Sequence, residues 1–163
     1  MTREGEIVVL REHLETGAVL GRRFLRVRSR IEDLMPMTPE RISALDDDQG
    51  IDVLAFLKTF EQFGDTLGRT LKTIAMLMQL GKVERLQPRD VAQRAVALGI
   101  LADVREWADA VRVRNELAHE YLLHPGKQSG QINAAWEKTT ILSQTATAIE
   151  DFVEREGLLR GDL

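Results

Sequence analysis

The chain has 163 residues, no cysteine and a formal net charge of −4. We expect a single domain over residues 1–163, and a hydrophobic content of 44% excludes a wholly disordered chain. The lack of cysteine excludes disulfides, cysteine–zinc sites and thiol nucleophiles. No apolar run approaches the roughly 20 residues of a membrane span, and acids interrupt the opening segment MTREGEIVVLREHLE. We therefore predict a cytoplasmic protein with no signal peptide and no membrane contact.

Two long helices are predicted in the first half of the chain. Apolar residues recur at steps of three and four over 4–35 and again over 49–80, which is the period of a helix with one buried face. Pro36 and Pro39 end the first helix, because each restricts the residue before it. Thr38 and Pro39 have the N-cap and first-turn pattern of a further, short helix.

Each long helix carries a pair of glycines spaced by four residues, Gly17 with Gly21 and Gly64 with Gly68. Glycine weakens a helix by about 1 kcal/mol relative to alanine, so we interpret each pair as a point where another helix approaches closely. We expect the second pair to lie across from the first.

The second half of the chain is predicted to be helical as well. A short helix begins at Pro88 and is closed by Gly99, and a longer one spans about 103–122 with Asp103 at its start. The segment HPGKQSG is predicted to be a turn, and the last helix runs from about 130 to 156. We find no alternating strand pattern. The predicted fold is an all-α antiparallel bundle of four to five helices.

Three candidate sites have an ordinary structural explanation. Asp46, Asp47 and Asp48 suggest a metal ligand cluster, but acids also complement the dipole at the start of the helix that follows, and we favour this second explanation. His13 is expected on the solvated side of the first helix, and His124 in a loop before a proline. We predict no metal site.

The segment VRNELAHEY differs because it concentrates polar side chains beside an apolar helix face. Arg114 and Tyr121 are seven residues apart and return to within about 20° of each other, whereas His119 is turned by about 140° from Arg114. An arginine that borders buried surface needs an anionic partner. That partner is either an acid of the chain, such as Asp109 or Glu61, or a ligand.

This segment resembles a known family. The string RNELAHEY is similar to the Rx4–6H motif of the HEPN superfamily and, with His119 and Tyr121, to the Rx4HxY signature of HepT-type toxins. The resemblance extends back through PRDVAQRAVALGILADVREWADAVRV, about a quarter of the chain in all. The linker PMTPERISALDDDQG and the long first helix depart from the compact family pattern. Members of this family are all-α homodimers that pair with an MNT-type minimal nucleotidyltransferase antitoxin.

The resemblance implies a metal-independent endoribonuclease. Arg114 would bind the scissile phosphate, His119 would act as general acid or base for attack by the RNA 2′-hydroxyl, and Asn115 would orient the phosphate or the histidine. Because one helix hardly gathers Arg114 and His119 on a single phosphate, a two-fold dimer that lines one cleft with both motif helices makes chemical sense.

Tyr121 matches the family tyrosine that the nucleotidyltransferase modifies with AMP. The added group would place charge and bulk beside Arg114 and exclude RNA. No cofactor is expected for this chain itself, and ATP and Mg²⁺ would serve only the partner enzyme. The alternative is a packed aromatic side chain whose hydroxyl bonds a neighbouring carbonyl.

A basic strip, GRRFLRVRSR, lies in the first helix. We regard Arg22, Arg26 and Arg30 of this strip, and Arg112 beside the motif, as weak candidates for RNA binding. The alternative for the strip is a solvated helix face with local acidic partners.

Two other functions compete with the toxin hypothesis. The first is a substrate-binding subunit that partners a nucleotidyltransferase and cleaves nothing, and the second is a purely structural helical dimer. Intact Arg114, His119 and Tyr121 favour the ribonuclease.

Overall fold

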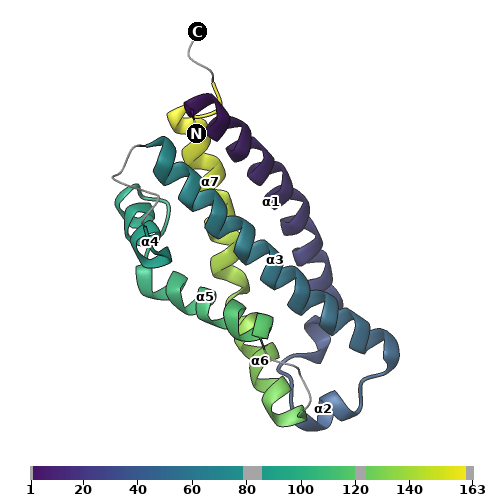
Figure 1. Ribbon diagram of the computed structural model, residues 1–163. Helices are drawn as coiled ribbons and strands as arrows, with labels where there is room; N and C mark the ends of the chain where they lie inside the picture. The colour runs from purple at the N-terminus through teal and green to yellow at the C-terminus, as the bar shows by residue number, and fades with distance from the viewer. Residues whose placement is uncertain (1, 79–85, 120–123, 161–163) are drawn as a thin grey trace.

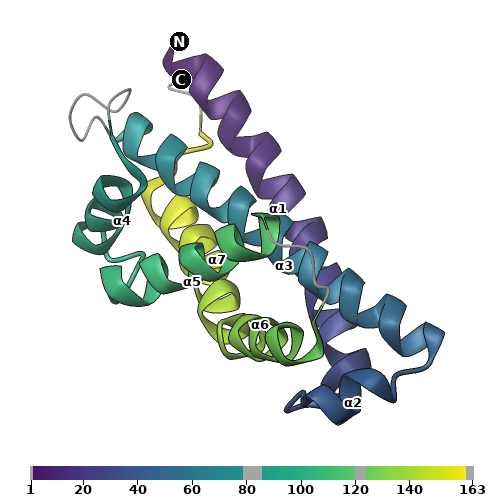
Figure 2. The ribbon, with the colours of Figure 1, turned by 60° about the horizontal axis from the view of Figure 1, so that its bottom comes forward.

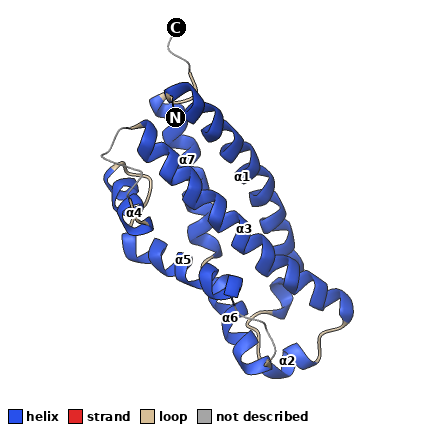
Figure 3. Cartoon of the chain, in the orientation of Figure 1, coloured by secondary structure: helices blue, strands red, loops and turns tan. Residues whose placement is uncertain are grey.

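The computed structural model describes residues 2–78, 86–119 and 124–160, and for His119 the backbone alone. Every regular element in these ranges is helical (Figure 3), which confirms the all-α prediction. Within them, no helix combines the length and the apolar character that crossing a bilayer requires. The elements are α1 (Arg3–Ile31), the 3-10 turn η1 (Glu32–Leu34), α2 (Pro39–Ser43), α3 (Asp47–Leu77), α4 (Pro88–Ala97), α5 (Val104–His119), α6 (Pro125–Glu137) and α7 (Thr139–Glu156).

The long helices α1, α3 and α7 lie side by side along the length of the molecule (Figure 1). The start of α1 and the end of α7 lie at the same end of this bundle, and α2 meets α6 at the opposite end. Helices α4 and α5 cover a different side of α3 from the one that contacts α1, so α3 lies between α1 and α5 in both views (Figures 1 and 2).

Aromatic rings fill the interface between α1 and α3. Phe24 of α1 is fully buried, and its ring stacks on Phe56 with the centroids 5.5 Å apart. The same ring packs at a tilt against Phe60 and Phe63 of α3. A Cβ atom on Gly21 would lie 3.3 Å from the ring of Phe63, so Gly21 marks a close approach of helices, as predicted, whereas a Cβ atom on Gly17 would lie at an ordinary 3.8 Å from Thr66.

The helix starts follow the sequence signals. The hydroxyl of Thr38 accepts a hydrogen bond from the backbone N–H of Arg41, and Pro39 occupies the first turn of α2. Asp46 caps α3 by accepting from the backbone N–H of Gln49. The three consecutive aspartates therefore begin a helix, and the described residues include no cluster of histidine and acidic side chains that could hold a metal ion.

The linker between the two long helices is fixed to α6. Asn133 donates its side-chain amide to the carbonyl of Met37 at 2.9 Å and accepts from the backbone N–H of the same residue at 2.8 Å. These two bonds hold the segment after η1 against α6, and the side chain of Met37 is buried there.

The prediction of a turn at HPGKQSG and of one last helix over 130–156 is wrong. The helix α6 begins at Pro125, and the chain breaks at Lys138 before it continues as α7. Proline and glycine mark turns, but proline also fits the first turn of a helix. The backbone N–H groups of that turn have no acceptor within the helix, so the N–H that proline lacks costs no hydrogen bond. Neither proline nor glycine stands near residue 138, so the break has no local signal.

Candidate functional site

The helix α5 presents Arg114 to α3. Asp103 caps α5 by accepting from the backbone N–H of Arg105, as predicted. Trp107, Ala110 and Val113 are buried and hold one face of α5 in the core, and Arg114 follows directly on the border of that face. Its side chain is 20% exposed.

The second glycine pair makes room for this arginine. A Cβ atom on Gly64 would lie 3.4 Å from Cδ of Arg114, and one on Gly68 would lie 3.7 Å from Nη1. The expectation that Gly64 and Gly68 face the glycines of the first helix is therefore wrong. They face α5, because the two sides of α3 serve two different partner helices.

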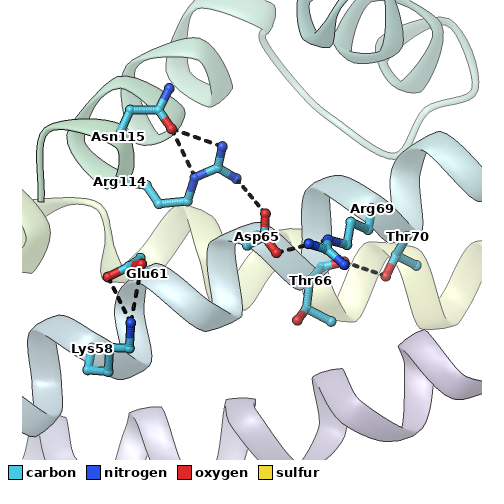
Figure 4. Close-up of polar contacts among 8 residues, drawn as sticks. All are labelled: Lys58, Glu61, Asp65, Thr66, Arg69, Thr70, Arg114 and Asn115. Atoms are coloured by element: carbon cyan, nitrogen blue, oxygen red, sulfur yellow. Dashed lines mark hydrogen bonds and ion pairs between the residues drawn. The ribbon is translucent and has the colours of Figure 1, made fainter. Parts of the chain in front are cut away.

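Asn115 and Asp65 hold the guanidinium of Arg114 (Figure 4). Nε and Nη2 donate to Oδ1 of Asn115 at 3.3 and 3.1 Å, and Nη1 lies 3.9 Å from Oδ1 of Asp65. The Asp65 side chain is 48% exposed and makes its shorter ion pair with Arg69, at 2.9 Å. Asn115 thus orients the arginine, while the nearest described carboxylate is partly solvated and shared with a second cation.

The acids that we predicted as partners of Arg114 bind other cations. Asp109 pairs with Lys138 and with Arg112, each at 2.8 Å, and Glu61 lies 3.4 Å from Lys58. Hydrogen bonds from Lys138 and then Arg112 lower the pKa of Asp109. The partner of Arg114 is thus an acid of the chain, which was one of the two alternatives, but that acid is Asp65 and neither of the two that we named.

Arg112 is engaged within its own helix. It pairs with Asp109 and with Glu116 at 2.7 Å, and these two acids raise its pKa. Its side chain is exposed, so an RNA phosphate would have to compete with both carboxylates.

A pocket of about 210 Å³ opens between α3, α4 and α5 beside Arg114. Its polar wall consists of Arg114, Asp65, Arg69 and Lys72, and its apolar wall comes from all three helices and the segment before α4. The pocket is lined by Asp65, Gly68, Arg69, Leu71, Lys72, Leu86, Pro88, Val91, Trp107, Val111 and Arg114.

Three charged residues of the pocket were not predicted from the sequence, namely Asp65, Arg69 and Lys72. These residues follow one another at steps of four and three on α3, so they share one face of the helix with Gly68. The signal in the sequence that would have found them is this charged face beside the glycine pair of Gly64 and Gly68.

Two predicted site residues fall outside this description. The backbone of His119 forms the end of α5, but its side chain lies outside the described residues, as does Tyr121 altogether. The structure therefore brings together Arg114 and Asn115, and leaves the relation of His119 and Tyr121 to them as a prediction.

The basic strip on α1 lies apart from this pocket. Arg30 binds Asp52 of α3 at 2.9 Å, and Asp52 raises its pKa. Arg28 lies over the ring of Trp136, 4.4 Å from its centroid. Arg22 and Arg26 are exposed, and within the described part of the chain neither has an ion-pair partner. None of the four lines the pocket.

His13 is half-buried, which corrects its predicted solvated position. It lines a small cavity of about 20 Å³ between α1, α3 and α7, together with Gly17, Thr70 and Glu150. Burial, followed by the positive charge of Arg69, lowers the pKa of its imidazole. His124 is exposed at the residue that precedes α6.

Comparison of the chain with family models, with curated proteins and with solved structures finds no significant match in any of the three.

Proposed function

We propose that this chain is a metal-independent endoribonuclease of the HEPN type, the toxin of a HEPN/MNT toxin–antitoxin pair. The observation that carries the proposal is the pairing of Arg114 with Asn115. The two are adjacent in the RNELAHEY motif, and the amide oxygen of Asn115 accepts two hydrogen bonds from the guanidinium. The guanidinium lies beside a pocket, with its carboxylate partner at 3.9 Å, so it retains donors for a phosphate.

In the proposed reaction Arg114 binds the scissile phosphate and stabilises the charge that develops on its oxygens. His119 serves as general acid or base. The 2′-hydroxyl loses its proton, its oxygen attacks the phosphorus, and the 5′-oxygen of the next nucleotide leaves and takes up a proton. The products are a 2′,3′-cyclic phosphate and a free 5′-hydroxyl, so the atoms balance without water or a metal.

The proposal includes a homodimer in which the motif helices of both protomers line one cleft, because positions five residues apart, such as 114 and 119, are turned by about 140° from each other on an ideal helix. It also includes silencing by the nucleotidyltransferase, which would use ATP and Mg²⁺ to transfer AMP to Tyr121. A clean monomer of 18.4 kDa at micromolar concentration would contradict the dimer.

The decisive experiment is cleavage of RNA by the purified protein in EDTA. We expect fragments that end in cyclic phosphate from the wild type, and none from Arg114→Ala or His119→Ala. Arg105→Ala is the matched control, because Arg105 is an exposed arginine on the same helix that does not line the pocket. Equal cleavage by the wild type and Arg114→Ala would overturn the catalytic assignment. Phosphate or RNA binding without any cleavage would favour the non-catalytic binding subunit instead.

The AMP modification has its own test. Incubation with an MNT-type nucleotidyltransferase, ATP and Mg²⁺, followed by peptide mass mapping, should place the added mass on Tyr121. AMP at another residue, or full inhibition of Tyr121→Phe by the same treatment, would contradict this part of the proposal.

A further inference from the structure

Three cations and one carboxylate surround the pocket between α3, α4 and α5. Arg114 comes from α5, whereas Arg69, Lys72 and the acid Asp65 come from α3. The whole chain has a net charge of −4, so this local excess of positive charge is opposite in sign to the molecule as a whole. Such a local field favours an anionic ligand.

The cations are incompletely neutralised. Asp65 is the acid of the pocket, and it binds Arg69 at 2.9 Å and Arg114 at 3.9 Å. Lys72 is exposed and has no ion-pair partner in the part of the chain that the structure describes. A guanidinium carries five N–H donors and an ammonium carries three, so all three side chains can bind a further anion.

The other wall of the pocket is apolar. Trp107 and Val111 line the pocket from α5, Leu71 lines it from α3, and Val91 lines it from α4. A volume of about 210 Å³ holds several water molecules but is smaller than the roughly 300–1,000 Å³ of typical ligand pockets. The space fits one phosphate group with part of the organic unit that carries it.

We propose that this pocket binds a phosphate ester, with Arg69 and Lys72 as ligand residues in addition to Arg114. Asp65 holds the two arginines when the phosphate is absent and gives them up when it binds. The apolar wall around Trp107 receives the sugar or base next to the phosphate. This inference deepens the proposed function, and rests on it in taking Arg114 as the phosphate-binding arginine, but it concerns binding and requires no cleavage.

The test measures binding of adenosine 5′-monophosphate and of a short 2′-O-methyl RNA by calorimetry at low salt. The second ligand cannot be cleaved through its 2′-oxygen, so binding is separated from catalysis. We expect Lys72→Ala and Arg69→Ala each to weaken binding by about tenfold, the consequence of losing one charge-assisted contact. Lys58→Ala is the matched control, because it removes the same charge from an exposed site on α3 outside the pocket, and we expect a change below about twofold.

Asp65→Asn supplies a test of opposite sign. Removal of the carboxylate should tighten binding of both ligands, since the phosphate no longer displaces an anion. A purely structural role for Asp65 would instead leave the affinity unchanged or weaken it, and either result would overturn its assigned role.

The outcomes of this experiment distinguish a mononucleotide ligand from an RNA ligand, and they distinguish this inference from the ribonuclease proposal. Binding of the mononucleotide alone identifies a nucleotide site, and binding of the RNA identifies a substrate subsite. If phosphate binding depends on Lys72 but no RNA is cleaved, the ribonuclease proposal fails and this inference stands. If RNA is cleaved and Lys72→Ala changes neither affinity nor KM, this inference fails and the ribonuclease proposal stands.

Discussion

Helix α3 packs against α1 on one side and against α5 on another, and the two interfaces use opposite chemistry. Against α1 the contact is made by aromatic rings around the fully buried Phe24, with Gly21 closing the distance between the helices. Against α5 the glycines Gly64 and Gly68 admit the side chain of Arg114 and leave a charged pocket beside it. The same spacing of two glycines therefore brings two backbones together in one interface, on α1, and makes space for a cation in the other, on α3. This contrast separates the part of the molecule that stabilises the fold from the part that we assign to function.

Truncation of Phe24 should have the largest effect on stability. We expect Phe24→Ala to lower the free energy of unfolding by about 3–5 kcal/mol, because it removes a fully buried ring that contacts three others. Urea denaturation measures the change. The adjacent Leu25 is 49% exposed, and Leu25→Ala should cost below about 0.5 kcal/mol. Similar losses in the two variants would contradict the assignment of this interface as the stabilising core.

Substitution of a glycine by alanine should destabilise the protein at the α1–α3 interface and should not destabilise it at the α3–α5 interface. Alanine favours a helix over glycine by about 1 kcal/mol. At Gly21 the new methyl would lie 3.3 Å from the buried ring of Phe63, which is fixed by its neighbours, so we expect a net loss of about 1 kcal/mol. At Gly64 the nearest atom is Cδ of a flexible arginine at 3.4 Å, so we expect stability to be unchanged or raised by up to about 1 kcal/mol.

Gly17→Ala is the control for Gly21→Ala. A methyl there would lie 3.8 Å from Thr66, an ordinary contact distance, so this variant should stabilise the protein. Thermal unfolding of the three single variants is sufficient. Stabilisation by Gly21→Ala would show that α1 and α3 approach less closely than the structure indicates.

Much of this contrast was predictable from sequence, because it depends on local rules. The period of apolar residues predicts α1 and α3, and the caps at Thr38 and Asp103 predict where two of the other helices begin. The RNELAHEY segment directs attention to Arg114 and Asn115, which the structure brings into contact. These features require only neighbours within a few residues along the chain.

The partners across helices were not predictable. Arg114 contacts Asp65 and not Asp109 or Glu61, because the choice depends on how α5 crosses α3. The same tertiary information decides which helix Gly64 faces, and therefore that Lys72 lines the pocket. Helix spacing tells which residues share a face, but a single sequence does not tell which neighbour covers that face.

Neutralisation of Arg114 should cost little stability and all activity. Its carboxylate partner is partly exposed and 3.9 Å away, and such a pair contributes about 0–1 kcal/mol. Arg114→Met keeps an unbranched apolar stem against Gly64, so we expect a change in the free energy of unfolding below about 1 kcal/mol, together with loss of RNA cleavage. Trp107→Ala on the same helix removes a side chain that is 4% exposed and should cost about 3–5 kcal/mol. If Arg114→Met lowered the free energy of unfolding as much as Trp107→Ala, Arg114 would belong to the stabilising core. The two interfaces of α3 would then not differ in the way that we infer.

The smallest expected effect concerns His13, at the cavity where α1, α3 and α7 meet. Burial and the charge of Arg69 lower the pKa of His13 below its ordinary value of 6.5, while Glu12 and Asp65 oppose this shift, and Glu150 lines the same cavity. The unfolded chain therefore binds a proton at a higher pH than the folded chain, and the free energy of unfolding rises with pH in that window. The stability that the neutral imidazole of His13 contributes is complete above the unfolded pKa of 6.5, and it is lost as the pH falls through the lower folded pKa.

The variant His13→Gln tests this pH dependence, because it keeps a polar side chain that does not titrate. Its free energy of unfolding should fall less than that of the wild type between about pH 7 and pH 5. Urea denaturation measures the difference between the two proteins. A difference that stays constant over this range would show that His13 titrates alike in the folded and unfolded states, and that its half-buried position at this cavity does not lower its pKa.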